Sequence, residues 1–166
     1  MKIRKAVEDA ATQQVVLFGR TVDREKIINL QWGAQLTVDI LASRHNPEEA
    51  GFVLETMYAA GCTYIYIGIE SMAEAVITNV HKNMNKKESW DVRVRRALGL
   101  ARQAGIRVGS SVLFGLEGET PETISETILK VEELLAEDLL SIASPNILTY
   151  HPNTEITHMH QMEEKL

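Results

Sequence analysis

The sequence contains a single cysteine, Cys62, among its 166 residues. One cysteine excludes an internal disulfide framework, a four-cysteine zinc site and a three-cysteine iron–sulfur site within this chain. Long apolar runs are also missing, because no stretch approaches the roughly 18 apolar residues of a membrane span. The N-terminal MKIRKAVEDA is amphipathic and does not resemble a signal peptide. We therefore expect a cytoplasmic protein without a membrane segment.

Basic residues are in the minority, with 17 lysines and arginines against 23 aspartates and glutamates and a net charge of -6. An acidic chain is poorly suited to broad contact with a phosphate backbone, so we do not expect nucleic acid as a partner. Prolines number only four and glycines ten, and no segment has the composition of a linker. The length suits one domain over residues 1–166, which buries roughly 70% of its unfolded surface.

Short β-rich runs alternate with helical runs along the sequence. The expected strands are 14–19, 35–41, 63–69, 106–114 and 141–150, and the expected helices are 2–11, 23–30, one from 47, 94–104 and one from 120. This alternation predicts βαβ units and a parallel sheet. Because five strands occur without a clear Rossmann fingerprint, the pattern favours an α/β fold built as a partial, TIM-like (β/α) barrel over a doubly wound sheet.

One connection in this pattern is unusually short. The helical run from Asp23 to Leu30 passes into Gln31 almost without a loop. Eight helical residues span only about 12 Å, and a loop between a helix and a strand usually adds about 2–6 residues. Such a crossover could hardly return the chain to the start of a parallel strand. We therefore expect a spatial break between Leu30 and Gln31, with Gly19–Arg20 as a second candidate.

Polar residues follow three of the expected strands. Gly68-Ile-Glu70-Ser71 places a carboxylate and a hydroxyl at a strand end, and the glycines of 109–120 precede a helix N-terminus that would attract anionic groups. Residues 146–154, at the end of the last expected strand, include polar and aromatic side chains that suit the binding of a purine or a sugar. Because sites in parallel α/β proteins gather at the carboxyl ends of strands, we expect Glu70, Gly115 and Tyr150 to converge in one concave mouth.

Four segments, AGCTYIYIGIES, HKNMNKK, ALGLARQAGIRVGSSVLFGLEGET and ILTYHPNT, resemble the middle and late barrel of the radical S-adenosylmethionine (radical SAM) superfamily, over about 31–156. Enzymes of that family hold a [4Fe–4S] cluster on a C-x-x-x-C-x-x-C loop. They cleave S-adenosylmethionine reductively to a 5′-deoxyadenosyl radical that abstracts hydrogen from the substrate. The resemblance implies both cofactors and an external electron donor of the flavodoxin or ferredoxin type. Cobalamin-dependent members share the late-barrel motifs, so cobalamin is compatible with the full-length protein, and the substrate stays unknown.

The resemblance also assigns roles to individual positions. Glu70 and Ser71 match residues that contact the methionine or ribose portion of S-adenosylmethionine, and the turn after Gly115 matches an element that packs against adenine, with Glu117 where proline is common. Gly19 corresponds to the glycine-rich end of the second strand. No catalytic residue and no metal ligand is assigned. The full set of cofactor-binding candidates is Gly19, Gly68, Glu70, Ser71, Ser111, Leu113, Gly115, Glu117, Asn146 and Tyr150.

The cluster motif itself is absent from this chain, and Cys62 precedes a strand, at the opposite end from the expected cluster. We therefore expect a radical SAM core that lacks its cluster loop and does not cleave S-adenosylmethionine alone. Two other functions remain open, a cluster-free module for a nucleotide-like ligand and an unrelated β/α-barrel lyase or isomerase with Glu70 as general base. The simpler interpretations are that Cys62 is a small buried hydrophobe and that the Lys82–Lys87 run is a solvated surface.

Overall fold

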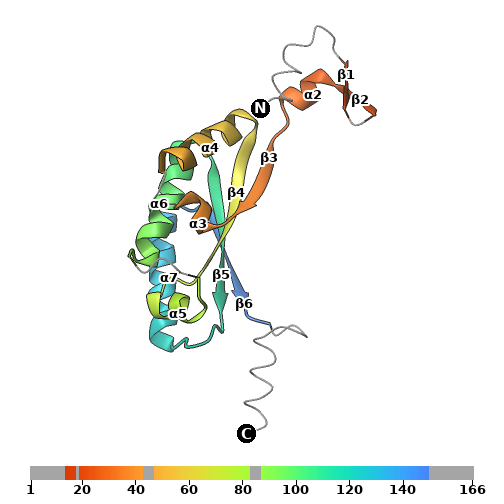
Figure 1. The fold of residues 1–166 in the computed structure, drawn as a ribbon. Coiled ribbons are helices and arrows are strands. Elements are labelled where there is room, and N and C mark those ends of the chain that lie inside the picture. The colour runs from red at the N-terminus through yellow and green to blue at the C-terminus, as the bar shows by residue number, and fades with distance from the viewer. Residues whose placement is uncertain (1–13, 18, 43–46, 83–86, 150–166) are drawn as a thin grey trace.

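A four-stranded parallel sheet forms the centre of the computed structural model, which describes residues 14–17, 19–42, 47–82 and 87–149 (Figure 1). The strands lie in the order β3-β4-β5-β6, and each neighbouring pair is parallel. Their bounds are Trp32–Leu36 for β3, Cys62–Glu70 for β4, Arg107–Phe114 for β5 and Ile142–Ile147 for β6. The predicted α/β class with a parallel sheet is confirmed.

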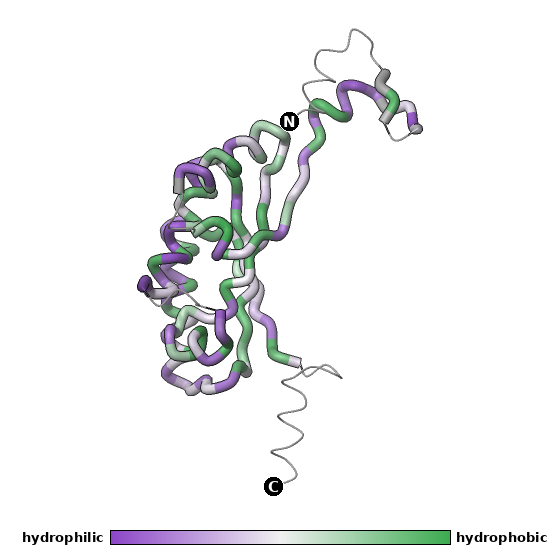
Figure 2. The backbone as a smooth tube through the Cα atoms, in the orientation of Figure 1, coloured by the Kyte–Doolittle hydropathy of each residue, from purple (hydrophilic) through white to green (hydrophobic). Residues whose placement is uncertain are grey.

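The helices that follow β3 all cover the same face of this sheet (Figure 1). They are α3 (Val38–Leu41), α4 (Pro47–Ala59), α5 (Glu74–Asn79), α6 (Trp90–Gln103) and α7 (Pro121–Ala136). Hydrophilic residues gather on the outer side of these helices (Figure 2). No described element covers the other face of the sheet, which we call the uncovered face.

Alternation along β4 separates the core from the uncovered face. Ile65, Ile67 and Ile69 are fully buried and pack in the core cluster with Trp90 of α6. The residues between them, such as Tyr66, are only partly buried. Because successive side chains of a strand point to opposite faces, every second residue of β4 is available to a ligand on the uncovered face.

The N-terminal strands form a separate hairpin instead of joining the sheet. β1 (Gln14–Leu17) pairs antiparallel with β2 (Arg20–Asp23), and α2 (Arg24–Ile28) follows. The described residues therefore contain four parallel strands, and the expectation of five is wrong. Figure 1 shows the hairpin and α2 beyond the starting end of β3, away from the carboxyl ends of the strands. The tight turn that joins the two strands directs the chain back on itself before any crossover can form.

This hairpin also explains the short connection before β3. The ribbon runs without interruption from α2 into β3 (Figure 1), and Leu17 pairs with Arg20 across the turn, so the structure has no spatial break at Leu30–Gln31 or Gly19–Arg20. A long crossover is unnecessary because α2 does not connect two parallel strands. β3 itself begins earlier than expected, at Trp32, and the second half of the expected strand 35–41 is α3, whose Val38 and Leu41 are buried at helical spacing.

The remaining elements agree with the sequence pattern. The expected helices from 47, over 94–104 and from 120 correspond to α4, α6 and α7, and Thr120 forms a capping box with Thr123 at the start of α7. The expected strand 141–150 is confirmed for its first part as β6. The expected helix 2–11 lies outside the described residues. Within the described ranges, no helix combines the length and the apolar character needed to span a membrane.

Candidate functional site

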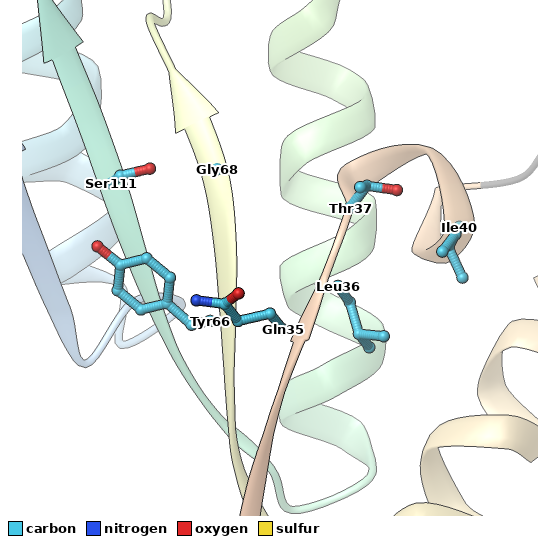
Figure 3. Close-up of a pocket in the computed structure, with 7 residues that line it drawn as sticks. All are labelled: Gln35, Leu36, Thr37, Ile40, Tyr66, Gly68 and Ser111. Carbon is cyan, nitrogen blue, oxygen red and sulfur yellow. The ribbon is translucent and has the colours of Figure 1, made fainter. Parts of the chain in front are cut away.

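A pocket of about 360 Å³ opens on the uncovered face near the carboxyl ends of the strands (Figure 3). Most of its polar groups are neutral amide or hydroxyl groups, and leucine and isoleucine side chains complete the wall. Two of the lining positions belong to β3, one is the N-cap of α3 and one lies within α3, with two more on β4 and one on β5. The lining residues are Gln35, Leu36, Thr37, Ile40, Tyr66, Gly68 and Ser111.

Strand register brings these side chains together. Gln35 is paired with Tyr66 across β3 and β4, and Gly68 is paired with Ser111 across β4 and β5. Figure 3 shows the Gln35 side chain reaching from β3 toward Tyr66. Gly68 and Ser111, both predicted as site residues, therefore share one face and one pocket.

Glu70 lies at the end of β4 beside this pocket. Its backbone has φ 65°, a conformation that costs a residue with a side chain about 1–2 kcal/mol. The pairing of β4 with β5 shifts register between Gly68 and Glu70. As a result the Glu70 carboxylate folds back over Gly68, where a Cβ atom would overlap Glu70 Oε1 and lie 3.1 Å from Lys82 Nζ. The absence of a side chain at Gly68 thus makes room for a carboxylate at the pocket.

Two side chains hold the Glu70 carboxylate. Lys82 Nζ donates a hydrogen bond to Oε1 at 2.6 Å, and Ser111 Oγ donates to Oε2 at 3.3 Å. The Lys82 and Glu70 side chains are 23% and 25% exposed, so the ion pair is partly shielded from solvent. Lys82 is therefore not a solvated surface residue, and that expectation is wrong for this position. Sequence reasoning missed Lys82 because α5, the short helix that precedes it, was not predicted.

Ser71 is directed away from the pocket, although it follows Glu70 directly. It is fully buried, its Oγ lies 2.9 Å from Thr127 Oγ1 of α7, and it accepts a hydrogen bond from the Ala73 amide. Thr127 Oγ1 also accepts a hydrogen bond from the Met72 amide at 3.2 Å. The predicted contact of Ser71 with a cofactor is therefore not supported by its position. Its hydroxyl instead joins the end of β4 to α5 and α7.

The loop after β5 is closed by its own contacts. The Gly115 amide donates a hydrogen bond to Glu119 Oε2 at 2.6 Å, so this amide is not free for the anionic group that we expected there. Glu117 is exposed, and its carbonyl oxygen accepts a hydrogen bond from Asn79 of α5. Leu113 packs against a small apolar cluster that includes Leu116. The loop is therefore held by its own glutamate and by the end of α5.

The other candidates are spread more widely. Asn146 is exposed on β6, where it pairs with Leu113 of β5, and its amide nitrogen donates to the Ser144 carbonyl. Gly19 lies in the turn of the hairpin with φ 74°, outside the parallel sheet, so its assignment to the end of a second parallel strand is wrong. Tyr150 lies outside the described residues. Of the three residues expected to converge, Glu70 ends β4 and Gly115 directly follows the neighbouring strand β5. The position of Tyr150 relative to them stays a prediction.

A buried arginine supports the β3 wall of the pocket. Asp39, between the lining residues Thr37 and Ile40, pairs with Arg93 of α6. Arg93 is 5% exposed, and its guanidinium lies 5.6 Å from the centre of the Trp90 ring. This contact joins α3 to α6 and so holds the end of β3 against the core.

The chain does not fit a [4Fe–4S] cluster. Its one cysteine, Cys62, is fully buried at the start of β4, and burial raises the pKa of its thiol above the ordinary value. Glu70 lies eight residue steps along β4 from Cys62, or roughly 26 Å away. In the part of the chain that the structure describes, no three His, Cys, Asp or Glu side chains form a group that could hold a metal ion. The pocket residues can instead bind and orient an organic ligand.

Comparisons with known proteins place this arrangement in a family. Residues 4–131, well over half of the chain, match the model of the Radical SAM superfamily. None of the curated proteins compared with the chain matches it significantly. Among solved structures, the radical S-adenosylmethionine methyltransferase TsrM from Kitasatospora setae, with cobalamin and a [4Fe–4S] cluster bound, is similar with a TM-score of 0.60 and 23% identity. The match covers 81% of this chain and 22% of that chain.

The structural likeness shows the fold, and with it the predicted partial barrel is confirmed. The chain spans less than a quarter of the TsrM chain that it matches. The family match supports more than the fold, because it rests on the sequence itself. Membership of this family implies an enzyme with S-adenosylmethionine and a [4Fe–4S] cluster as cofactors. It also overturns the alternative of an unrelated lyase or isomerase barrel. The chain belongs to the radical SAM superfamily.

Proposed function

We propose that this chain is the part of a radical SAM enzyme that holds S-adenosylmethionine on the uncovered face of the sheet. In this proposal, Glu70 accepts hydrogen bonds from the methionine or ribose portion of the ligand. The cysteines that bind the cluster would come from polypeptide outside this sequence, because the chain has only one cysteine. Reductive cleavage of S-adenosylmethionine and hydrogen abstraction from a substrate are thus proposed for the complete protein, and this chain alone is inactive.

The position of the Glu70 carboxylate carries the proposal. A backbone conformation that is unfavourable for glutamate places the carboxylate over Gly68, at the pocket and at the carboxyl end of a parallel strand. Strained residues persist where the surrounding structure holds them, and they concentrate at functional sites.

The pocket also has a suitable size and chemistry. Its volume of about 360 Å³ lies in the range of small-molecule sites. Gln35, Thr37, Tyr66 and Ser111 supply neutral hydrogen-bonding groups, and the Tyr66 ring supplies an aromatic surface. Such a lining suits a nucleoside, which combines a flat base with sugar hydroxyl groups.

Calorimetric titration of this chain with S-adenosylmethionine tests the proposal. We expect weak binding, because the cluster that contacts the amino and carboxylate groups is missing. Glu70→Gln should weaken that binding about tenfold or more, since a hydrogen bond to a charged group contributes about 1.5–3 kcal/mol. Absence of binding, or equal binding by Glu70→Gln, would refute the role of Glu70.

Activity assays test the missing cluster separately. Under dithionite, this chain should form no 5′-deoxyadenosine, and detection of that product would contradict the argument from the single cysteine. Anaerobic reconstitution of the longer gene product with iron and sulfide should give the visible absorption of a cluster. Cleavage of S-adenosylmethionine should then require an electron donor such as reduced flavodoxin. A longer product without a cluster would favour the remaining alternative, a cluster-free module for a nucleotide-like ligand.

Cobalamin is a separate expectation for the full-length protein. It rests on the shared late-barrel motifs and on the TsrM structure, whose description includes cobalamin. The absorption spectrum of the longer gene product, purified after growth with cobalamin, would test it. A spectrum without corrin bands would remove cobalamin from the proposal and leave the role of Glu70 unaffected.

A further inference from the structure

We propose that Lys82 is a positioning residue, which fixes the Glu70 carboxylate in the orientation that the ligand requires. This inference rests on the function proposed above and concerns a residue to which the sequence assigned no role. The two contacts of the carboxylate are unequal, because Lys82 Nζ lies 2.6 Å from Oε1 whereas Ser111 Oγ lies 3.3 Å from Oε2. A charged donor at the shorter distance forms the stronger bond. The orientation of Glu70 therefore depends mainly on Lys82.

Lys82 comes from a firmly attached part of the fold. Its backbone amide donates to the Ile77 carbonyl at the end of α5, and Ile77 is fully buried. His81, the residue before it, has φ 53°, which turns the chain at this point. A second positive φ thus occurs at the residue directly before the other partner of the ion pair. Glu70 is placed by its own costly backbone conformation, and Lys82 by the turn at His81.

α5 is itself joined to the ends of both central strands. Ser71, directly after β4, accepts a hydrogen bond from the Ala73 amide at the start of α5. Asn79, at the end of α5, donates to the Glu117 carbonyl in the loop after β5. These contacts limit movement of α5 relative to the sheet. The ammonium group of Lys82 consequently reaches the uncovered face at a defined position.

The arrangement leaves a specific oxygen for the ligand. Oε1 is engaged by Lys82, while Oε2 shares a longer contact with Ser111, which lines the pocket. A carboxylate offers about four lone-pair positions, so Oε2 can accept a further hydrogen bond from a ligand hydroxyl or amino group. Without Lys82, the side chain of Glu70 could rotate away from Gly68, and the ligand would have to order it on binding.

The test compares variants of this chain in titrations with 5′-deoxyadenosine and S-adenosylmethionine. Lys82→Gln should weaken binding about tenfold, which corresponds to about 1.4 kcal/mol, and Lys82→Arg should recover most of the loss because it retains the positive charge. Lys26→Gln, on the exposed surface of α2, removes the same charge elsewhere and should bind like the parent chain.

An exchange of the two charges separates positioning from stability. Glu70→Lys combined with Lys82→Glu can re-form the ion pair, so the thermal unfolding midpoint should return close to that of the parent chain while binding stays weak. A purely structural pair predicts that the exchange restores both, and this result would overturn the inference. Unchanged binding by Lys82→Gln, with binding weakened by Glu70→Gln, would also overturn it and leave the proposed function intact. Unchanged binding by Glu70→Gln would overturn both.

Discussion

Replacement of Gly68 by alanine should separate ligand binding from folding stability. The φ of Gly68 lies outside the left-handed region, so alanine can adopt the same backbone without strain. Its Cβ would overlap Glu70 Oε1 and lie 3.1 Å from Lys82 Nζ. Both atoms are the ends of flexible side chains, which can move at little cost. We therefore expect the ion pair to open and the carboxylate to leave the pocket.

The two contributions to stability nearly cancel. Alanine in place of a strand glycine stabilises by about 0.5–1 kcal/mol, because the unfolded chain has less conformational freedom. Loss of a partly exposed ion pair costs about 0–1 kcal/mol. The net change should lie within about 1 kcal/mol, which shifts the unfolding midpoint by less than about 4 °C in a domain of this size. Binding of S-adenosylmethionine should nevertheless weaken about tenfold or more, as for Glu70→Gln.

Thermal unfolding by circular dichroism and titration calorimetry measure the two effects on the same protein. Gly51→Ala and Gly99→Ala are matched controls, because a Cβ at either helical position meets no atom within 4 Å. Each control should stabilise the chain by about 0.5–1 kcal/mol and leave binding unchanged. Full binding by Gly68→Ala would refute the use of the Glu70 carboxylate as the ligand contact. A loss of more than about 3 kcal/mol would show that the ion pair stabilises the fold far more than partly exposed pairs do.

Two further predictions concern the structure around the site, and a third concerns Cys62 at the far end of β4. Thr127→Val keeps the shape of a buried side chain but leaves polar groups beside Ser71 without their partner, so urea denaturation should show a loss of about 1–3 kcal/mol. Asp39→Asn removes the charge opposite the buried Arg93 and should cost about 2 kcal/mol and weaken ligand binding; an unchanged denaturation midpoint would contradict this role. The Cys62 thiol should react with Ellman's reagent only after unfolding. Burial raises the pKa of this thiol, so the contribution of Cys62 to stability should be complete below about pH 8.5 and decline as the pH rises further. Denaturation measured across this pH range should show a smaller alkaline loss for Cys62→Ala.

Local sequence patterns determined the main elements of this fold. Alternation of buried and partly buried residues along β4, helical periodicity in α6 and the capping box of α7 each depend on residues close together in the chain. Regular spacing of strands and helices then predicted a parallel sheet, whose carboxyl edge is where ligand sites form. Gly68, Glu70 and Ser111 could be predicted from this logic and from the strand-end motifs, because their register positions follow from the order of the strands.

Contacts between distant segments decided the rest. Gln14–Leu17 has the composition of a strand, but only its pairing with β2 shows that it forms a hairpin instead of a parallel strand. Ser71 differs from Glu70 by one position, and its partner Thr127 lies 56 residues away, so tertiary packing directs its hydroxyl to the helices. Lys82 follows a helix of six residues, too short for a periodic signal. The residue types therefore determined which segments become strands and helices, whereas the choice of partner across the fold determined which polar groups reach the pocket.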